Sequence, residues 1–327
     1  MVNKDFLLGF GAGKAAGGGG GGQPTDTEDA IIMRTLSGVY SNSRVTAIGT
    51  SAFAGNSGSF SVSFPNVTGI GSSAFYSCSH LTGAYFPACT SVGGSAFYNC
   101  KELTSAYFPV CQTVGNAAFI SCSSLAAISF PACTSIGNSG FYGLSMSLAS
   151  FPECLSIGAM AFAFCKKLQE FHGPKLSFAG SGAFYGCSSL TTVNLPVLSS
   201  ILSNTFSSCT NLNSVSVPAA EEVGSNAFYS CSHLEVISLP VCSKINQSAF
   251  FRNERLMSLY LLSTSVCDLL NSKAFDVCPI GGYSNVTGDY GSVFVRASLL
   301  ASYKSATNWV ILSDRLVGLT DEEIEAL

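Results

Sequence analysis

Carboxylate side chains are scarce where the sequence is most regular. Asp is missing from residues 50–262, and Glu221 and Glu222 are the only adjacent acids in that segment. Hydrolysis of a glycosidic bond needs two carboxyl groups that converge on one bond, whereas neighbours on an extended turn point apart. We therefore expect these glutamates to be solvated turn residues. The lack of Asp also argues against calcium-binding β-helix repeats.

The C-terminal segment holds the acids that could form a catalytic site. Asp268, Asp276 and Asp289 are concentrated there. An enzyme with a site in this segment is therefore an alternative to a binding protein. A pocket that joins two of these carboxylates with shifted pKa values would favour the enzyme, and a filled segment would argue against it.

Three histidines could act as general bases or metal ligands. His80 and His233 occupy the same position in two distant copies of a repeated motif, so they cannot share a metal ion. His172 falls on an expected strand, and the nearby Cys165 falls at a core position, which argues against a Cys-His nucleophile. We expect exposed histidines and no metal site.

The cysteines fall into two columns, a column being the set of residues at one position of successive repeats. Neither column has the Cys-x₂₋₄-Cys spacing of zinc sites. Parallel side chains about 4.8 Å apart exceed the Cβ separation of a disulfide. Leu or Ala fills the same positions in sister repeats, so we expect buried free thiols. The first column is Cys78, Cys100, Cys122, Cys165, Cys187, Cys209 and Cys231, and the second is Cys89, Cys111, Cys133, Cys154 and Cys242.

The glycine-rich N-terminus contains two weak matches to nucleotide-binding motifs. Residues 9–14 end in Gly-Lys, but Ala15 follows where a phosphate-binding loop needs Ser or Thr. Gly11 and Gly13 begin a loose dinucleotide pattern that no expected strand or βαβ unit frames. We expect a linker here and no cofactor.

The amino-acid composition argues against nucleic acid and anionic membranes as binding partners. The 327 residues are 47% hydrophobic and only 10% charged, with a formal net charge of −4. This balance lacks the positive charge that binds nucleic acid or anionic membranes. No stretch is long and apolar enough for a membrane helix, and the apolar run at residues 6–8 is too short for a signal peptide.

Phenylalanine recurs at nearly constant intervals along the chain, and we call this series the phenylalanine register. The step between successive members is 22 residues, except for one step of 21, and such regularity predicts a stack of similar units. Each unit is too small to bury its own apolar face, so stacking must supply the core. The members are Phe53, Phe75, Phe97, Phe119, Phe141, Phe162, Phe184, Phe206, Phe228 and Phe250.

One unit identifies the repeat type. Residues 81–92 have the spacing L-x-x-φ-x-φ-x-x-C-x-x-φ, with Cys89 at the Asn/Cys position of leucine-rich repeats. The trailing Ile/Val-Gly-x-x-Ala-Phe-x-x-Cys-x-x-Leu resembles the BspA-like leucine-rich repeats of bacterial surface proteins and some phage-encoded proteins. The resemblance covers residues 45–310 and implies adhesion to proteins or glycans. Leu81, Ala84 and Phe86 should point inward.

The resulting expectation is an α/β solenoid in four parts. It is a right-handed leucine-rich-repeat array with a parallel sheet on one face and short helical or 3₁₀ turns on the other, capped at both ends. Residues 1–24, with six glycines at 17–22, form a flexible tether, and 25–49 form an N-terminal cap with a helix through about Arg34. The repeats occupy 50–262. Residues 263–327 form a C-terminal cap with a last strand at 293–295.

The predicted function is non-enzymatic recognition on a bacterial surface or a phage particle. Solenoids bind along extended surfaces, and one outward column on the strand face varies in chemistry. From it we select Tyr85, Tyr107, His172, Asn194 and Tyr260 as binding residues for a protein or glycan. A structural protein of a virion is an alternative, and no oligomeric state is favoured. The column is Ser63, Tyr85, Tyr107, Ser129, Ser150, His172, Asn194, Ser216, Ser238 and Tyr260.

A second stripe of tyrosines directly follows the phenylalanines and is the alternative surface. It would form an aromatic ridge on the turn side if its members were exposed together. The stripe is Tyr76, Tyr98, Tyr142, Tyr185 and Tyr229.

Overall fold

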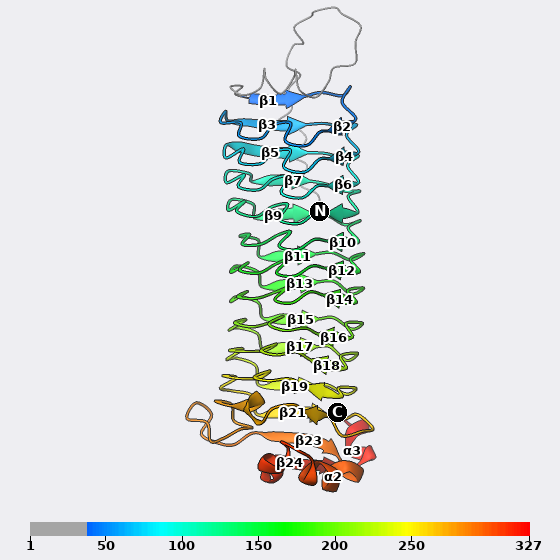
Figure 1. The fold of residues 1–327 in the computed structure, drawn as a ribbon, viewed down its shortest axis with the longest axis vertical. Helices are drawn as coiled ribbons and strands as arrows, with labels where there is room; N and C mark the ends of the chain where they lie inside the picture. The colour runs from blue at the N-terminus through cyan, green and yellow to red at the C-terminus, as the bar shows by residue number, and fades with distance from the viewer. Residues whose placement is uncertain (1–37) are drawn as a thin grey trace, which may run out of the picture.

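The computed structural model describes residues 38–327 as an elongated column of stacked rungs (Figure 1). Each repeat contributes one strand, a corner, a second strand of two residues and a turn that leads to the next rung. All strand pairs are parallel, which confirms the predicted solenoid. The predicted tether at residues 1–24 and the helix at 25–34 lie outside the described residues.

The longer strands form two consecutive parallel sheets on one side of the column. They are β1 Gly38–Ser41, β3 Phe60–Ser63, β5 Leu81–Tyr85, β7 Ser105–Tyr107 and β9 Ala127–Ser129 in the first sheet, and β11 Leu148–Ser150, β13 Glu170–His172, β15 Thr192–Asn194, β17 Ser214–Ser216, β19 Val236–Ser238, β21 Ser258–Leu261, β23 Ser292–Arg296 and β24 Leu316–Leu319 in the second.

The two-residue strands form a further pair of parallel sheets. Short helical turns were expected on this side, and the repeats instead use this second ladder together with hydrogen-bonded turns. Its strands are β2 Ala47–Ile48, β4 Gly69–Ile70, β6 Ser91–Val92, β8 Thr113–Val114, β10 Ser135–Ile136, β12 Ser156–Ile157 and β14 Phe178–Ala179, followed by β16 Ser200–Ile201, β18 Glu222–Val223, β20 Lys244–Ile245 and β22 Asp268–Leu269.

The turns supply a third set of hydrogen bonds between rungs. The N–H groups of Ser73, Phe75 and Ser77 donate to carbonyls of the next rung at 2.8, 2.7 and 2.7 Å, while the N–H groups between them donate within the rung. Ser73 and Ser77 both have a φ of 56°, in the left-handed region that side chains disfavour. Most rungs are therefore bonded to the next on three sides, and these bonds run along the axis.

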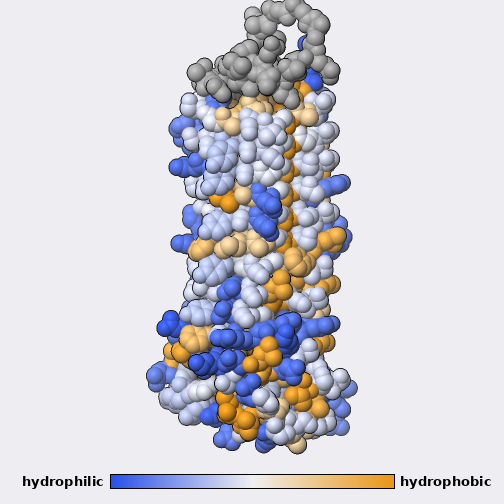
Figure 2. Space-filling model, in the orientation of Figure 1, coloured by the Kyte–Doolittle hydropathy of each residue, from blue (hydrophilic) through white to orange (hydrophobic). Residues whose placement is uncertain are grey.

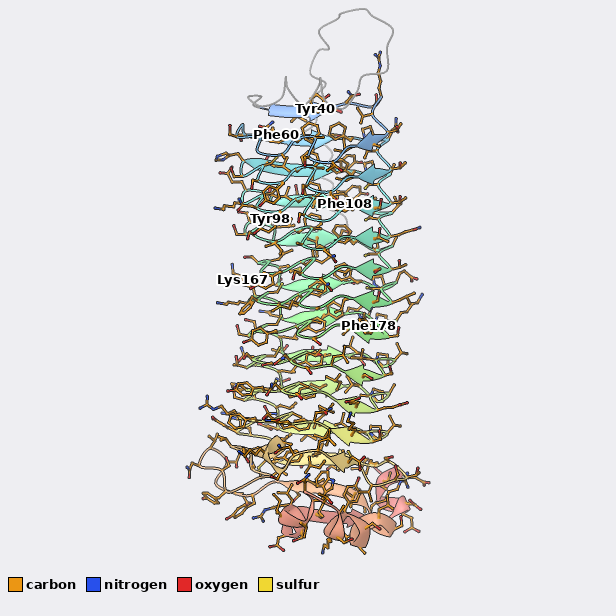
Figure 3. The ribbon with its side chains drawn as sticks, viewed as in Figure 1. Tyr40, Phe60, Tyr98, Phe108, Lys167 and Phe178 are labelled. Atoms are coloured by element: carbon orange, nitrogen blue, oxygen red, sulfur yellow. The ribbon has the colours of Figure 1, made fainter. Side chains whose placement is uncertain are left out.

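The core is a stack of phenylalanine rings that runs inside the column (Figure 3). Phe119 is fully buried, as predicted, with its ring stacked 5.0 Å from Phe97 and 5.4 Å from Phe141. Phe108 contacts it edge-on at 6.2 Å, because phenylalanines from the turn and from the strand interdigitate. Leu81, Ala84 and Phe86 are buried as expected.

Glycine follows the inward residue of most short strands because the rungs approach each other most closely there. A Cβ on Gly93 would lie 2.7 Å from the backbone of the preceding rung, and one on Gly115 would lie 2.6 Å from it. Leu202 replaces this glycine in the rung where the short-strand ladder is interrupted between β14 and β16. Asn246 also replaces it, and there the side-chain amide donates to the carbonyl of Val223 at 3.0 Å.

One residue is missing from the repeat that produces the single step of 21. In sister repeats a leucine at this core position comes six residues after the phenylalanine of the register. Met146 fills the position here and comes five residues after Phe141. Strands β9 and β11 flank this shortened connection and belong to different sheets. The rings of Phe130 and Phe151 lie 6.5 Å apart across it, compared with 5.1 Å for Phe108 and Phe130.

Short helices close the C-terminal end. The predicted strand at 293–295 is confirmed within β23, but β24 pairs with β23 and is the last strand. Tyr303 and Trp309 are fully buried, and both bond the backbone of Cys267. The Tyr303 hydroxyl accepts the N–H of Cys267 at 2.9 Å, and the indole N–H of Trp309 donates to the carbonyl of Cys267 at 2.7 Å. The helices are η3 Ser272–Phe275, η4 Ala297–Leu299, α2 Leu300–Ser305, η5 Val310–Arg315 and α3 Asp321–Glu325.

None of the helices within residues 38–327 has the length and apolar character needed to span a lipid bilayer.

Candidate recognition surface

The selected residues lie on the outward face of the longer strands. Tyr85 is the ladder partner of Tyr107, and His172 is the ladder partner of Asn194. The three tyrosines are half-buried, whereas His172 and Asn194 are exposed. The structure therefore brings four of the five selected residues together in two neighbouring pairs, and Tyr260 lies further along the same column beside Phe294. Ser63 of the same column is buried, so this surface begins at β5.

The aromatic residues on this face stack on one another. The rings of Tyr85 and Tyr107 are 5.0 Å apart with an interplanar angle of 5°, and those of Tyr260 and Phe294 are 4.6 Å apart at 14°. Two rings that cover each other in this way cannot both lay a face on one sugar. Each stack instead turns the edges of its rings outward, and its members are half-buried.

A second outward column lies beside the first and was missed from the sequence. Its members precede the selected residues by two positions, and strand alternation alone could have identified them. Leu148 and Val236 are exposed at 54% and 49%, unusually high for aliphatic side chains. The column is Gly83, Ser105, Ala127, Leu148, Glu170, Thr192, Ser214, Val236 and Ser258.

This strand face, meaning both outward columns from β5 to β21, is almost uncharged. Glu170 is its only Asp, Glu, Lys or Arg residue, and it lies next to the exposed His172 on β13. Serine supplies most of the other polar groups. In Figure 2 the middle of the column is mostly pale, and strongly hydrophilic side chains gather near the C-terminal end.

The tyrosine stripe on the turn side forms an aromatic ridge with two additional phenylalanines. The rings of Tyr76 and Tyr98 stack at 5.0 Å, and those of Tyr229 and Phe251 stack at 5.3 Å. Where Ala163 replaces the tyrosine, the ring of Phe164 contacts Tyr142 and Tyr185 at 5.4 and 5.1 Å. Tyr98 and Lys167 lie on this side of the column (Figure 3). Apart from Tyr76, which is 40% exposed, these rings are half-buried and protect the core edge.

The cysteines are buried, and many of them also act as hydrogen-bond donors. All fourteen thiols are free, and in the first column Cys78, Cys100 and Cys122 donate to a phenylalanine carbonyl of the preceding rung at 2.9 to 3.1 Å. Thiols are weak donors, but these carbonyls lie in the dry core. Burial raises the pKa of the Cys89 and Cys154 thiols to about 11, which opposes nucleophilic or metal-binding roles.

The turn histidines lie at the surface, as predicted. His80 pairs with Glu102 at 2.9 Å, with both side chains about half exposed, and His233 contacts the carbonyl of Thr210 at 2.7 Å. In residues 38–327 no three His, Cys, Asp or Glu side chains are arranged to hold a metal ion.

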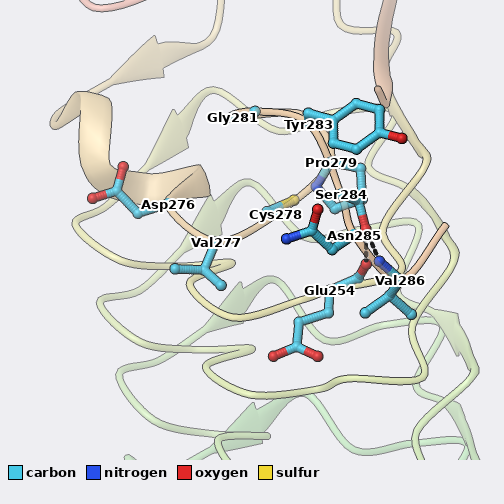
Figure 4. A pocket seen from close by; sticks show the side chains of 11 residues that line it. Glu254, Asp276, Val277, Cys278, Pro279, Gly281, Tyr283, Ser284, Asn285 and Val286 are labelled. Carbon is cyan, nitrogen blue, oxygen red and sulfur yellow. Dashed lines mark hydrogen bonds between the residues drawn. The ribbon is translucent and has the colours of Figure 1, made fainter. Parts of the chain in front are cut away.

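The three C-terminal aspartates have different surroundings in the described part of the chain. Asp276 lines a cavity together with Glu254 (Figure 4). Asp268 is instead the ladder partner of Lys244, and the Asp289 carboxylate accepts the N–H of Tyr290 at 2.7 Å. Of the three aspartates, only Asp276 lines this cavity.

Comparison with known proteins supports the repeat type. Six copies of a family model described as a BspA-type leucine-rich repeat region match residues 33–147, 90–197 and 134–257. No curated protein matches the chain.

Solved structures similar to this chain are bacterial leucine-rich repeat proteins. One from Bacteroides ovatus is 22% identical, with 84% of this chain and 69% of that chain covered at a TM-score of 0.67. A leucine-rich cell surface protein from Faecalibacterium prausnitzii is 19% identical over 87% and 92% of the chains, with a TM-score of 0.41. One from Eubacterium ventriosum is 16% identical over 77% and 84%, with a TM-score of 0.39. The first of these shares the fold of this chain.

Proposed function

Since this chain belongs to the family of BspA-type leucine-rich repeats, we propose that it is a recognition module that binds a protein or glycan along its strand face. The observation that carries the proposal is the chemistry of that face. Apart from the buried Gly83, its two outward columns are exposed or half-exposed, nearly uncharged and varied in side chain, while the inward residues between them are uniformly apolar. Packing does not dictate such variation, and solenoids use extended surfaces of this kind for binding.

The arrangement favours a long, uncharged ligand. The stacked pair Tyr85–Tyr107 and the pair Tyr260–Phe294 lie near opposite ends of the face. Seven rung steps separate Tyr107 from Tyr260, which corresponds to roughly 34 Å at strand spacing. Between them, His172, Asn194 and many serine hydroxyls offer hydrogen bonds. A polysaccharide or an extended peptide segment could contact both aromatic pairs at once.

Display outside the cell is a further part of this proposal. The resemblance to repeats of bacterial surface and phage proteins supports it, as does the six-glycine run at residues 17–22, a composition typical of flexible tethers. Antibodies against the chain should label intact cells or particles of the source. Labelling confined to lysed material would contradict display, without affecting the proposed binding face.

Binding can be tested with a glycan array and a panel of host-surface proteins, using the full chain. For a ligand so found, Tyr85→Ala, Tyr107→Ala and His172→Ala should each weaken binding about fivefold or more, equivalent to about 1 kcal/mol. The unfolding midpoint should change little for His172→Ala, because that side chain is exposed.

Tyr76→Ala and Tyr142→Ala on the turn side are the matched controls, since they also remove single tyrosines from aromatic stacks. Loss of binding in these two variants, with normal binding in the strand-face variants, would move the site to the ridge. Absence of any ligand on the array and the protein panel would contradict the proposed function.

A further inference from the structure

Cys267, in the C-terminal cap, is out of register with the cysteine columns of the repeats. Every cysteine of the second column comes two residues before a short strand, as Cys242 comes two residues before Lys244 at the start of β20. Cys267 comes only one residue before Asp268, which is the ladder partner of Lys244. One residue is therefore missing between Cys267 and its strand, and Cys267 stands level with Ser243 instead of with Cys242.

The shift changes the partners of the Cys267 backbone. Ser243, at the equivalent position of the preceding rung, donates its N–H to the carbonyl of Glu221 at 2.8 Å. The N–H of Cys267 donates instead to the hydroxyl of Tyr303 at 2.9 Å, and its carbonyl accepts the indole N–H of Trp309 at 2.7 Å. The backbone of Cys267 is therefore the point at which two buried side chains of the cap are attached.

The shift also brings two buried thiols into contact. The Sγ atoms of Cys242 and Cys267 lie 3.9 Å apart, and both side chains are fully buried. Cys242 also donates to the carbonyl of Lys244 at 3.4 Å, as is usual in its column, whereas Cys267 has only the carbonyl of Asp268 at 3.9 Å. The sulfur of Cys242 is therefore as close to the Cys267 thiol as any backbone acceptor is.

The backbone geometry at this contact is compatible with a disulfide. Because Lys244 and Asp268 are ladder partners, the two chains run about 4.8 Å apart there, inside the range of Cα separations found across disulfides. Disulfides within a column are disfavoured because the side chains are parallel and in register. Cys242 and Cys267 are offset by one residue, so that objection does not apply to them.

The contact makes the two sulfurs chemically unequal. The hydrogen bond between them lowers the pKa of Cys242, which accepts it, and raises the pKa of Cys267, which donates it. Burial alone has the opposite effect on Cys89 of the same column, whose pKa it raises to about 11. The thiolate is the nucleophile in thiol–disulfide exchange, so Cys242 is the more reactive of the two.

We propose that Cys242 and Cys267 form a redox pair whose disulfide fastens the C-terminal cap to the last repeat. The Cys242 thiolate attacks a small disulfide such as oxidised glutathione, whose S–S bond breaks to give a mixed disulfide and one glutathione thiolate. Cys267 then loses its proton to water and attacks the Cys242 sulfur, which releases the second glutathione. Two protein thiols are thus oxidised and one glutathione disulfide is reduced to two thiols.

The buried position of the pair determines when this exchange can occur. Both sulfurs are closed off from solvent in the folded chain, so the oxidant reaches them only while the cap is open or has not yet docked. Once formed, the bond keeps the attachment point of Tyr303 and Trp309 in place. The inference does not depend on the strand face proposed above.

Refolding the full chain from urea in glutathione buffers of graded potential can test the proposal. Two of the fourteen thiols should be lost at a potential where the others remain, and peptide mapping should place the bond between Cys242 and Cys267. Cys242→Ala and Cys267→Ala should each keep all of their remaining thiols at that potential. Cys111 and Cys133, which are in register on adjacent rungs, are the matched control pair and should stay reduced.

Hydrogen exchange separates a fastening bond from an incidental one. Amides of α2, η5 and β24 should exchange about tenfold more slowly in the oxidised wild-type chain than in the reduced one. This comparison needs no variant, so it stands even if Cys267→Ala does not fold.

Three results would overturn the proposal. One is the retention of all fourteen thiols at every potential. Another is the oxidation of Cys111 and Cys133 at the same potential as Cys242 and Cys267, because adjacency on the column would then be sufficient. The third is equal exchange of the cap amides in the oxidised and reduced chains, which would show that the bond does not fasten the cap.

Discussion

The ring of Phe171 occupies the space that a side chain at Gly173 would need. A Cβ built on Gly173 would lie 2.7 Å from Cε1 of Phe171. The neighbouring rung has the opposite arrangement. There the smaller Val193 lies at the position equivalent to Phe171, and the large Leu195 lies at the position equivalent to Gly173. The ring reaches the phenylalanine stack edge-on, 4.8 Å from Phe184. In this rung the large side chain is therefore at position 171 and the small residue at position 173, the reverse of the neighbouring rung.

This exchange predicts that Gly173→Ala is destabilising. The added methyl group must displace the buried ring, so the free energy of unfolding should fall by about 1–3 kcal/mol in urea titrations. Gly94→Ala is the control, because a Cβ there meets nothing closer than the carbonyl of Asn116 at 3.4 Å. Adding Phe171→Val to Gly173→Ala should recover part of the loss, since the clash is removed. A loss below about 0.5 kcal/mol for Gly173→Ala would contradict this account.

The phenylalanine stack predicts a large effect for Phe119→Ala. The ring contacts its neighbours on both sides, so its deletion leaves a cavity that the rigid rungs cannot close. The free energy of unfolding should fall by about 3–5 kcal/mol. Ser129→Ala, an exposed change in the same repeat, should alter it by no more than about 0.5 kcal/mol. If Phe119→Ala loses less than about 1 kcal/mol, this column does not carry the core.

Substitutions of Cys122 can show whether its thiol stabilises the fold by hydrogen bonding or only by filling apolar space in the core. It donates to the carbonyl of Phe97 at 3.0 Å in the core. Cys122→Ala removes the donor and should destabilise the fold by about 1–2 kcal/mol. Cys122→Ser keeps a donor and should lose less than Cys122→Ala. If Cys122→Ser is the less stable of the two in thermal unfolding, the column is selected for apolar volume alone.

Buried thiols also predict alkaline destabilisation. Burial raises the pKa of Cys89 from 9.0 to about 11, so this thiol stays neutral in the folded protein at a pH where it ionises in the unfolded chain. Its contribution is complete below pH 9 and is lost as the pH rises toward 11. Within this window each such thiol lowers the free energy of unfolding by up to about 1.4 kcal/mol per pH unit.

The variant Cys89→Ala isolates one thiol from the other groups that titrate above pH 9. Between pH 9 and 10.5 its stability should decline less steeply than that of the wild type, as measured by urea unfolding. Equal slopes would show that Cys89 ionises equally in both states. Thiol titration under denaturing, non-reducing conditions should also find nearly all fourteen cysteines free, and mostly paired cysteines would contradict the buried-thiol model.

The sequence predicted those elements whose side chains are large, apolar and repeated. Phe119, Leu81 and Cys89 are at the expected core positions because each lies at a fixed step from its copies in neighbouring repeats. The short ladder was missed because a strand such as β6 has only two residues, too few for alternation to be visible. The left-handed turn residues were missed because serine, at Ser73 and Ser77, stands where glycine is usually expected.

The surface was predicted only in part. Alternation placed Tyr85 and His172 on the outward face, but the stacking of Tyr85 on Tyr107 depends on side-chain angles that spacing does not specify. The contact between Cys242 and Cys267 was not predicted, because Cys267 lies 25 residues after Cys242 instead of 22 and so belongs to neither cysteine column.

The hydrogen bonds that join the rungs run along the axis, and this alignment determines how the protein responds to mechanical load. A pull applied between the two ends would load the bonds of successive rungs in series rather than in parallel. Rungs should therefore peel away one at a time, each releasing roughly 75 Å of chain at low force. We expect this peeling to begin at the interruptions between β9 and β11 and between β14 and β16, where one ladder of hydrogen bonds is missing. A column of this kind would lengthen in steps under load instead of breaking apart in a single event.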